Sequence, residues 1–462
     1  MKRLISLILT ILITAALCSC DLFSVGNILR RFTGETRPVY TDMPLSGGGV
    51  EPGFHEDENG FLILNRPEYV KSAQYDPLTT PYSFQQLRSQ RQKALYDDIY
   101  DGCFCLSDQP NEEFEGEYDL RPILLDSMDY SYMEVEEVLA AVLADHPEIF
   151  WMSMDFDIYD YKADNESEVV LHTDYKADEV IVMMNQLDDS LKEFYSQLPP
   201  NLSPYEREVL VYSFIINTCV YDTAVEDSDE YSDSHPHLYN LCGVLVDKLA
   251  VCEGYARAFD YLCSSIGVES VCITGIEEDD EDALHIWNAV LLDDEWYLCD
   301  ATWDDWDEEE DVTDAYLYLN LDDATMNLDH TADKTYAELS EDEYWELSSY
   351  INTFVPESCT ATTYSYILRE SVYLDSISVD RLCEGMVKAA ENHRDSLMVC
   401  VDPEVYTPEQ AAEKLFAGDQ PYYQAMDLAN TKLLGVQLDA DSDASYYEED
   451  DRNLLVFELN YR

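Results

Sequence analysis

The chain has 462 residues, of which 46% are hydrophobic and 35 are tyrosines, so it can bury substantial cores and is not globally disordered. Its length corresponds to roughly three domains of about 150 residues each. The formal charge of −71 excludes nucleic acid as a partner, because duplex binding needs clustered Lys and Arg, and it disfavours direct adsorption on anionic lipid. The charge suits basic or lysine-bearing substrates, although a solvated, self-repelling surface is the simpler explanation.

The N-terminal residues 1–20 have the pattern of a bacterial lipoprotein signal peptide. Two basic residues precede the apolar run Leu4–Leu17, which is too short to span a membrane comfortably. The run ends in a lipobox-like sequence, in which Cys20 occupies the position that receives lipid and Cys18 fits less well. We therefore expect an exported protein, held only by lipid on Cys20 at the outer face of the bacterial cytoplasmic membrane. A plain secretory signal or an uncleaved anchor is the alternative.

Two further segments precede the centre of the chain. Residues 21–60 are rich in Gly, Pro and acidic residues and lack hydrophobic periodicity, which predicts a flexible tether. Residues 61–200 are predicted to form an N-terminal α/β domain. Apolar residues at helical spacing indicate three helices, near 84–99, 135–143 and 181–198, and two strands are expected within 149–161 and 168–175.

Residues 201–350 are predicted to form a central domain. Ser203, followed by Pro204 and Glu206, is a capping box that begins a helix extending to about residue 219. Residues 238–250 are expected to form a short helix leading to Cys252. After the central stretch, residues 315–326 are expected to form a strand and a turn, and His330 is expected to be a local turn or cap residue.

Residues 356–462 are predicted to form a C-terminal α/β domain. Strands are expected near 364–373, 396–401, 433–438 and 454–461, and helices near 379–390 and 407–416. The segment beginning at Asp439 starts like a calcium-binding loop. It has Ala444 where such loops have glycine and Asp450 where they have glutamate, so we do not predict calcium there.

Cys252 lies where a catalytic thiol would be expected. Cysteine is a nucleophile as the thiolate, and a helix N-terminus favours that charged form. An apolar stripe at helical spacing begins just after Cys252, and Gly267 ends the predicted helix. The backbone N–H of Cys252 is a candidate oxyanion donor. Tyr239 and Asn240 are candidates for the second oxyanion donor. The neighbouring cysteines are predicted to be core thiols or structural disulfides: Cys242, Cys263, Cys272 and Cys299.

A predicted hairpin brings a base and an acid together. Residues 284–292 and 295–302 read as two strands joined by a turn at Asp293-Asp294. In that register Trp287 faces Asp300, and His285 faces Thr302. His285 and Asp300 then lie diagonally on the same face of the sheet, roughly 7–8 Å apart at Cα, so their side chains can meet. This arrangement predicts an imidazole oriented by a carboxylate, as an activated cysteine requires.

Three blocks containing these residues, AVCEGYARAF, ALHIWNAV and WYLCDATWDD, resemble the transglutaminase-like superfamily, which has a papain-like fold. Bacterial members have sequences close to CEGYA, HAWN and DxTW; Ile286 replaces the usual alanine here. The resemblance covers about residues 203–332 and implies that Cys252 is the nucleophile, His285 the base and Asp300 the orienting acid. The DHPEIFW phrase of the N-terminal unit resembles domains found beside this core in exported proteins of anaerobic Gram-positive bacteria.

The predicted fold class is therefore α+β. A papain-like transglutaminase core, in which a helix bearing Cys252 packs on an antiparallel sheet bearing His285 and Asp300, is expected between two small α/β units. We expect a thiol enzyme that acts on peptide or protein amides through a thioester. Protease, deamidase and transglutaminase activities all stay open, as does the oligomeric state.

A catalytically silent fold that serves as a surface binding or scaffold module is the alternative function. No cofactor and no metal are expected, because the sequence has no CxxC pair and Cys103 and Cys105 are too close together for a zinc knuckle. After Cys18 and Cys20 are set aside, an odd number of cysteines is left, so at least one thiol should be unpaired.

Overall fold

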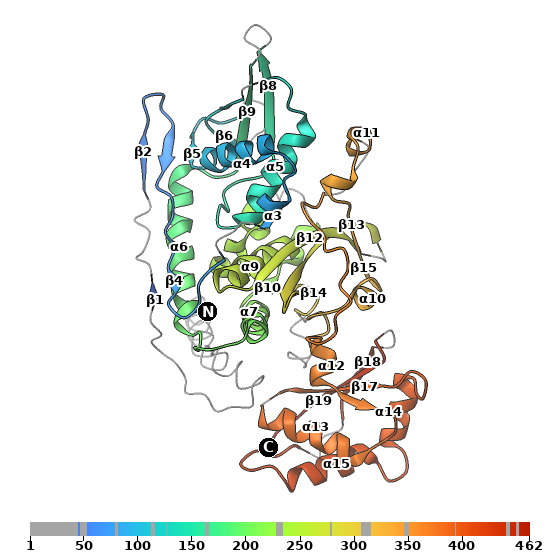
Figure 1. The fold of residues 1–462 in the computed structure, drawn as a ribbon. Coiled ribbons are helices and arrows are strands. Elements are labelled where there is room, and N and C mark those ends of the chain that lie inside the picture. Colours follow the sequence, from blue (N-terminus) through green and yellow to red (C-terminus); the bar gives the residue numbers. More distant parts are fainter. Residues whose placement is uncertain are drawn as a thin grey trace, which may run out of the picture.

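The structure is a computed structural model that describes residues 45–46, 53–78, 82–111, 116–125, 127–161, 166–227, 234–277, 280–305, 316–345, 351–392, 394–439, 444–449 and 452–462. The predicted signal peptide with Cys20, most of the predicted tether and the calcium-like positions 440–443 lie outside these residues. Within them, no helix combines the length and apolar character that a membrane span needs. Figure 1 shows the N-terminal, central and C-terminal parts following one another from top to bottom.

Among its described residues, the N-terminal part has four helices and several strands. Its elements are β1 (Leu45–Ser46), β2 (Phe54–Glu56), β3 (Leu62–Leu64), β4 (Lys71–Ser72), α3 (Tyr82–Gln86), α4 (Gln90–Gly102), β5 (Cys105–Leu106), β6 (Tyr118–Asp119), β7 (Ile123–Leu125), α5 (Tyr132–Asp145), β8 (Phe156–Tyr161), β9 (Glu166–Thr173) and α6 (Ala177–Ser196). Strand β1 pairs with β4 and β2 with β3, where a flexible tether was expected. Backbone pairing needs no hydrophobic pattern, so the sequence did not reveal these strands.

Two of the three N-terminal helices are confirmed as α5 and α6. The prediction of one helix near residues 84–99 is wrong, because α3 and α4 are separate helices. Ser89 interrupts it by capping α4, where its side chain accepts a hydrogen bond from the backbone of Gln92. The strand expected within 149–161 is shorter, since only β8 is extended there.

The central part is a four-stranded antiparallel sheet in the order β14-β13-β12-β15, with α9 packed on β12 and β13 (Figure 1). The elements are α7 (Pro204–Thr218), β10 (Val220–Tyr221), η2 (Thr223–Asp227), η3 (Pro236–Tyr239), η4 (Gly243–Asp247), β11 (Leu249–Ala250), α9 (Cys252–Ser265), β12 (Glu269–Glu277), β13 (Asp280–Leu292), β14 (Glu295–Cys299), α10 (Asp323–Met326), β15 (His330–Ala332), η5 (Tyr336–Glu338) and α11 (Glu341–Tyr344). The α+β fold class is confirmed, and so are the capping box of α7 and the end of α9 at Gly267, whose φ is 74°.

Two predictions for the central part differ from the structure. The helix predicted over residues 238–250 is shorter: η3 ends at Tyr239, residues 241–247 are helical, with η4 a π-helix, and strand β11 follows. Residues 316–321 are irregular rather than a strand. There the backbone N–H groups of Leu317 and Tyr318 donate to the buried Asp304 carboxylate, at 2.7 and 2.9 Å, so a side chain takes the place of a strand partner.

The C-terminal part has a sheet in the order β16-β17-β19-β18. Its elements are α12 (Tyr366–Glu370), β16 (Val372–Leu374), α13 (Val379–Glu391), β17 (Ser396–Val401), α14 (Pro408–Phe416), α15 (Pro421–Asn430), β18 (Tyr446–Glu449) and β19 (Leu454–Glu458). Of the strand predicted near 364–373, residues 366–370 form helix α12 and only its end lies in β16, and residues 433–438 are not a strand. Helix α15 was not predicted. The other helices and strands expected in this part are confirmed.

The C-terminal sheet is buried on both faces. Along β19, Leu455 and Phe457 belong to the core formed with the C-terminal helices. Leu454 and Val456 alternate with them and belong instead to the large core shared by the N-terminal and central parts. Strand side chains alternate between faces, so the C-terminal part packs directly on the rest of the chain. The domain boundaries given above stay predictions.

Glu208 on α7 is a buried carboxyl group whose Oε2 accepts a hydrogen bond from Asn320 at 3.0 Å. Burial raises the pKa of Glu208 to about 8, against the lowering effect of that hydrogen bond. The folded state therefore holds this proton more tightly than the unfolded state does. Stability should fall as pH rises from the unfolded value of about 4.5 towards 8.

Replacing Glu208 with glutamine should remove this pH dependence. The expected fall in the wild-type free energy of unfolding is on the order of a few kcal/mol across that window. Urea unfolding of the wild type and of Glu208→Gln on both sides of the window measures the difference. Parallel pH profiles for the two proteins would contradict a buried, proton-holding Glu208.

Candidate active site

Cys252 is the first residue of α9 and is half-buried. Its backbone N–H lies in the first turn, where the helix itself supplies no acceptor. Gly254 lets the start of this helix approach the preceding loop closely. A Cβ on Gly254 would lie 2.5 Å from the carbonyl oxygen of Leu238 and 2.8 Å from the Cβ of Ala250. The glycine two residues after the cysteine therefore fixes where the thiol sits.

Asn288 fastens this helix to the sheet. It lies on β13 and is buried, and its Nδ2 donates to the carbonyl oxygen of Ala256 on α9 at 3.0 Å. Strand β13 also carries His285, so one strand positions both the helix that bears the thiol and the imidazole. The role of this asparagine in the HIWN block was not recognised from the sequence.

The hairpin that carries the base and the acid has the predicted register. Leu292 pairs with Glu295, and the pairing continues to Asn288 with Cys299. Asp293 and Asp294 have φ of 51° and 65°, as a two-residue hairpin turn with two positive φ angles requires. The strand ends earlier than predicted, however. The expected pairs of Trp287 with Asp300 and of His285 with Thr302 do not form.

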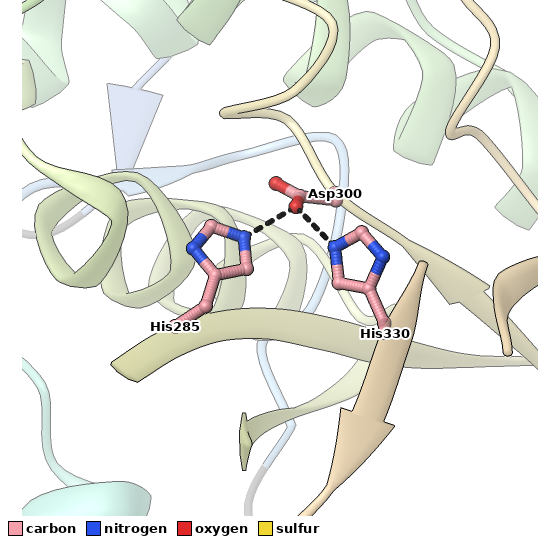
Figure 2. Close-up of side chains that lie close together, drawn as sticks. All are labelled: His285, Asp300 and His330. Atoms are coloured by element: carbon pink, nitrogen blue, oxygen red, sulfur yellow. Dashed lines mark hydrogen bonds and ion pairs between the residues drawn. The ribbon is translucent and has the colours of Figure 1, made fainter. Parts of the chain in front are cut away.

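Asp300 leaves the sheet and donates its backbone N–H to the carbonyl oxygen of Tyr318, at 2.9 Å. Its carboxylate nevertheless reaches the imidazole, as Figure 2 shows: His285 Nε2 lies 2.6 Å from Asp300 Oδ2. Both side chains are buried. The structure thus brings together the predicted base and acid, although by a turn after β14 rather than by continued strand pairing.

The Asp300 carboxylate has partners on both oxygens. Oδ1 accepts the backbone N–H groups of Thr302 and Trp303, at 2.8 and 3.3 Å, and Oδ2 faces His285 and His330. Burial opposes the charged form, but the two histidines outweigh it and hold the pKa of Asp300 well below its usual range. Asp300 is therefore an ionised carboxylate in a fixed orientation.

His285 is held as a charged imidazole. Burial would lower its pKa, but Asp300 and a hydrogen bond and charge interaction with Cys252 outweigh burial and raise the pKa of His285 to about 10. Since Nε2 is directed at Asp300, Nδ1 is the nitrogen left for the thiol; Glu277 Oε1 also lies 3.7 Å from Nδ1. The arrangement places a charged imidazole beside the Cys252 thiol, as activation of a nucleophilic cysteine requires.

His330 joins this site, so its prediction as a local turn or cap residue is wrong. It begins β15, the edge strand beside β12, and its Nε2 lies 3.1 Å from Asp300 Oδ2 (Figure 2). This contact is not evident from the sequence, because the two residues lie 30 positions apart in the chain. Long-range sheet order, with β15 beside β12, creates the contact.

One group of side chains in the described part of the chain could hold a metal ion: His285, Asp300 and His330. Their ligand-type atoms lie within 4.8 Å of one another. Two ligands of one tetrahedral zinc ion, each about 2.0–2.1 Å from it, lie about 3.3 Å apart. The 2.6 Å between His285 Nε2 and Asp300 Oδ2 is instead a charge-assisted hydrogen-bond distance. The geometry therefore fits a hydrogen-bonded network better than a metal site.

The remaining thiols differ from Cys252. The eleven cysteines that the structure describes are all free thiols, so none of the four neighbours forms a disulfide; three of them lie in the core, and Cys272 is half-buried. Burial raises the pKa of each of these four: Cys242, Cys263, Cys272 and Cys299. A cavity of about 500 Å³ lies near the other end of α9, lined in part by Asp260, Tyr261 and Ser264, and Cys252 is not among its lining residues.

Asn240 does not fit the second oxyanion donor. Its side-chain amide donates to Tyr175 Oη at 3.1 Å and to the carbonyl oxygen of Phe150 at 3.2 Å, and its backbone N–H donates to the carbonyl of His237. These bonds tie the loop before Cys252 to the N-terminal part. The acidic residues 277–282 and 304–311, which flank His285 and Asp300 in the sequence, lie largely outside the residues whose side chains the structure describes.

Helix α9 begins with a cysteine and packs on an antiparallel sheet whose histidine bonds to an aspartate in the turn after β14, which is the arrangement of a papain-like fold. The family model of the transglutaminase-like superfamily matches residues 195–301, and this segment is a transglutaminase-like domain. It contains Cys252, His285 and Asp300 and ends before His330.

The chain is similar to two curated proteins over this region. It is 28% identical to the kyphoscoliosis peptidase of Mus musculus over 131 residues, which cover 26% of this chain and 18% of that protein. It is 25% identical to the kyphoscoliosis peptidase of Homo sapiens over 126 residues, covering 25% and 17%. The chain thus spans less than a fifth of their length. A crystal structure of a TGase aligns over 36% of this chain and 48% of its own, with 11% identity and a TM-score of 0.23.

Proposed function

We propose that the protein is a thiol acyl-transfer enzyme that acts on peptide or protein amides. The observation that carries this proposal is the buried His285–Asp300 pair, 2.6 Å apart, facing a helix whose first residue is the half-buried Cys252. The transglutaminase-like domain supports the same chemistry. Cys252 is assigned as nucleophile, His285 as acid and base, and Asp300 as the residue that orients His285.

In the proposed reaction, the Cys252 thiolate attacks an amide carbonyl carbon and forms a C–S bond. The C–N bond then breaks, and the leaving amine takes a proton from His285 Nδ1. Water or a primary amine next attacks the thioester, gives its proton to His285 and releases the thiolate. Asp300 keeps Nε2 protonated, so Nδ1 is the nitrogen that exchanges the proton. Water gives hydrolysis and an amine gives a crosslink.

The substrate and the location are part of the proposal. The acidic composition favours basic or lysine-bearing protein substrates, because a charge of −71 attracts them over long range. The lipobox-like sequence favours attachment through lipid on Cys20 at the outer face of the cytoplasmic membrane. Activity that is insensitive to salt and to substrate charge would remove the electrostatic part of this proposal.

Incubation with a broad peptide library and a labelled primary amine, followed by mass spectrometry, tests the reaction. Cleaved peptides identify a protease, deamidated glutamine a deamidase and incorporated amine a transglutaminase. We expect at least one of these products from the wild type and none from Cys252→Ala. If neither protein forms a product and Cys252 reacts no faster than free cysteine, the fold is a binding module instead.

A further inference from the structure

His330 is linked on both sides. Its Nε2 lies 3.1 Å from Asp300 Oδ2, and its Nδ1 lies 2.6 Å from Asp329 Oδ1. The side chain is fully buried. An ionised carboxylate oxygen only accepts, so each ring nitrogen must carry a proton to make both bonds. His330 is therefore an imidazolium in this arrangement.

The environment of His330 stabilises that charge. The rings of Trp303, Trp287 and Tyr318 lie around it, with centroids 4.4, 4.9 and 5.7 Å from its own. Aromatic faces attract a buried cation. Burial opposes protonation, but Asp300 and Asp329 outweigh it and raise the pKa of His330, while the charge of His285 acts the other way. Glu277, opposite His330 in the β12–β15 pairing, is a further acidic neighbour.

The network continues into the C-terminal part of the chain. Asp329 Oδ2 accepts hydrogen bonds from Arg452 at 3.0 Å and from Tyr318 Oη at 2.7 Å. Arg452 lies between β18 and β19, is buried, and has its guanidinium 4.3 Å from the Tyr318 ring centroid. Figure 1 shows β18 directed towards the central sheet near α10 and β15. A residue more than 120 positions away from Asp329 thus anchors the group that holds His330.

The charges of the four linked groups cancel: Asp300 and Asp329 are negative, and His330 and Arg452 are positive. Glu277, 3.7 Å from His285, and Glu449, 3.7 Å from Arg452, are acidic neighbours outside this set. Buried charges are tolerated when they are paired in this way, and removal of one member leaves another uncompensated. The orientation of the Asp300 carboxylate therefore depends on groups beyond its own hairpin.

We propose that His330 is a positioning residue that fixes Asp300 against His285, and that Arg452 of the C-terminal part completes the active site by holding Asp329 on His330. The catalytic consequence rests on the proposed thiol chemistry. The C-terminal part is then a component of the catalytic unit rather than an appended binding module. Neither His330 nor Arg452 lies in the segment that matches the transglutaminase-like superfamily.

Five proteins test the network: the wild type, His330→Leu, His330→Gln, Arg452→Met and Arg394→Met. Glutamine keeps a donor for Asp300 but no charge. Arg394 is the matched control, because it is as buried as Arg452, pairs with Glu370 in the same part of the chain and lies 5.8 Å from the Tyr366 ring centroid. The readouts are the alkylation rate of Cys252 at neutral pH and kcat and KM for the library-derived substrate.

We expect His330→Leu to lower both the alkylation rate and kcat at least tenfold with KM nearly unchanged, and His330→Gln to recover part of the loss. Arg452→Met should lower kcat several-fold, whereas Arg394→Met should behave as the wild type. An activated wild-type Cys252 together with unchanged rates in folded His330→Leu and Arg452→Met would overturn the inference. A wild-type Cys252 that reacts like free cysteine would instead overturn the proposed function.

Histidine ring NMR keeps the inference testable if a variant does not fold. The chain has 8 histidines, so ¹⁵N-histidine labelling gives a tractable spectrum. In the wild type, both ring nitrogens of His330 should stay protonated to a higher pH than in an ordinary imidazole, and Asp329→Asn should make His330 lose a proton at lower pH. A wild-type His330 that loses its proton at or below the ordinary imidazole value of about 6.5 would overturn the network whatever the activity of Cys252.

Discussion

Replacing Cys252 with alanine should abolish amide turnover, a loss of at least 10³-fold, since the nucleophile is removed. No other described thiol pairs with an imidazole and a carboxylate in this way. The change should alter the free energy of unfolding by no more than about 1 kcal/mol, because Cys252 is half-buried in the first turn of α9. Product formation by mass spectrometry and urea unfolding measure the two effects.

Cys272→Ala is the matched control for this variant. Cys272 lies on β12 in the same domain and is also half-buried, but burial raises its pKa and its sulfur contacts Asn288 rather than His285. We expect turnover by Cys272→Ala within a few-fold of the wild type. Equal turnover by Cys252→Ala and the wild type would exclude Cys252 as the nucleophile.

Replacing Asp300 with asparagine should lower kcat by a factor on the order of 10³–10⁴, as loss of the orienting acid does in serine-protease triads. The amide cannot serve both imidazoles as a charged acceptor, so His285 loses its fixed proton on Nε2. Removing one member of a buried charge network should also destabilise the fold by about 3–5 kcal/mol. Steady-state kinetics and urea unfolding measure both losses.

The pH dependence of stability gives a second test of Asp300. Its pKa in the folded state is depressed, so its stabilising effect is complete above the unfolded value of about 3.9 and is lost as pH falls through the folded value. The wild type should lose this contribution in acid, and Asp300→Asn should lack it at every pH. Asp260→Asn is the control. Asp260 is also a buried aspartate, but it lies on α9 and accepts a hydrogen bond from Ser270 instead of facing a histidine. A similar loss of kcat in both variants would contradict a specific role for Asp300.

The sequence predicted the parts of the site that depend on local periodicity. The helix that begins at Cys252 follows from its apolar stripe, and the hairpin register follows from the turn at Asp293-Asp294. The end of β14 could not be predicted. Asp300 leaves the sheet because its backbone N–H donates to Tyr318, which is a tertiary contact, while its carboxylate accepts the local N–H groups of Thr302 and Trp303.

His330 and Arg452 could not be predicted for the same reason. Each is an ordinary residue in a polar stretch, and only the order of strands in the central sheet and the packing of β19 bring them to Asp300 and Asp329. The missed helix α15 and the misassigned residues 433–438 show a related limit. Short apolar runs without clear periodicity fit a strand or a loop equally well, and the tertiary core decides between them.

The most direct test of the account is the pH dependence of Cys252 alkylation by iodoacetamide, followed by peptide mass spectrometry in the wild type and in His285→Gln. The pKa of His285, raised to about 10, keeps a charged imidazole beside Cys252 across neutral pH. The wild-type rate at neutral pH should therefore exceed that of His285→Gln, in which Cys252 has no imidazole beside it and should react as an ordinary thiol does. A wild-type rate that rises with pH and coincides with that of His285→Gln would contradict an activated Cys252.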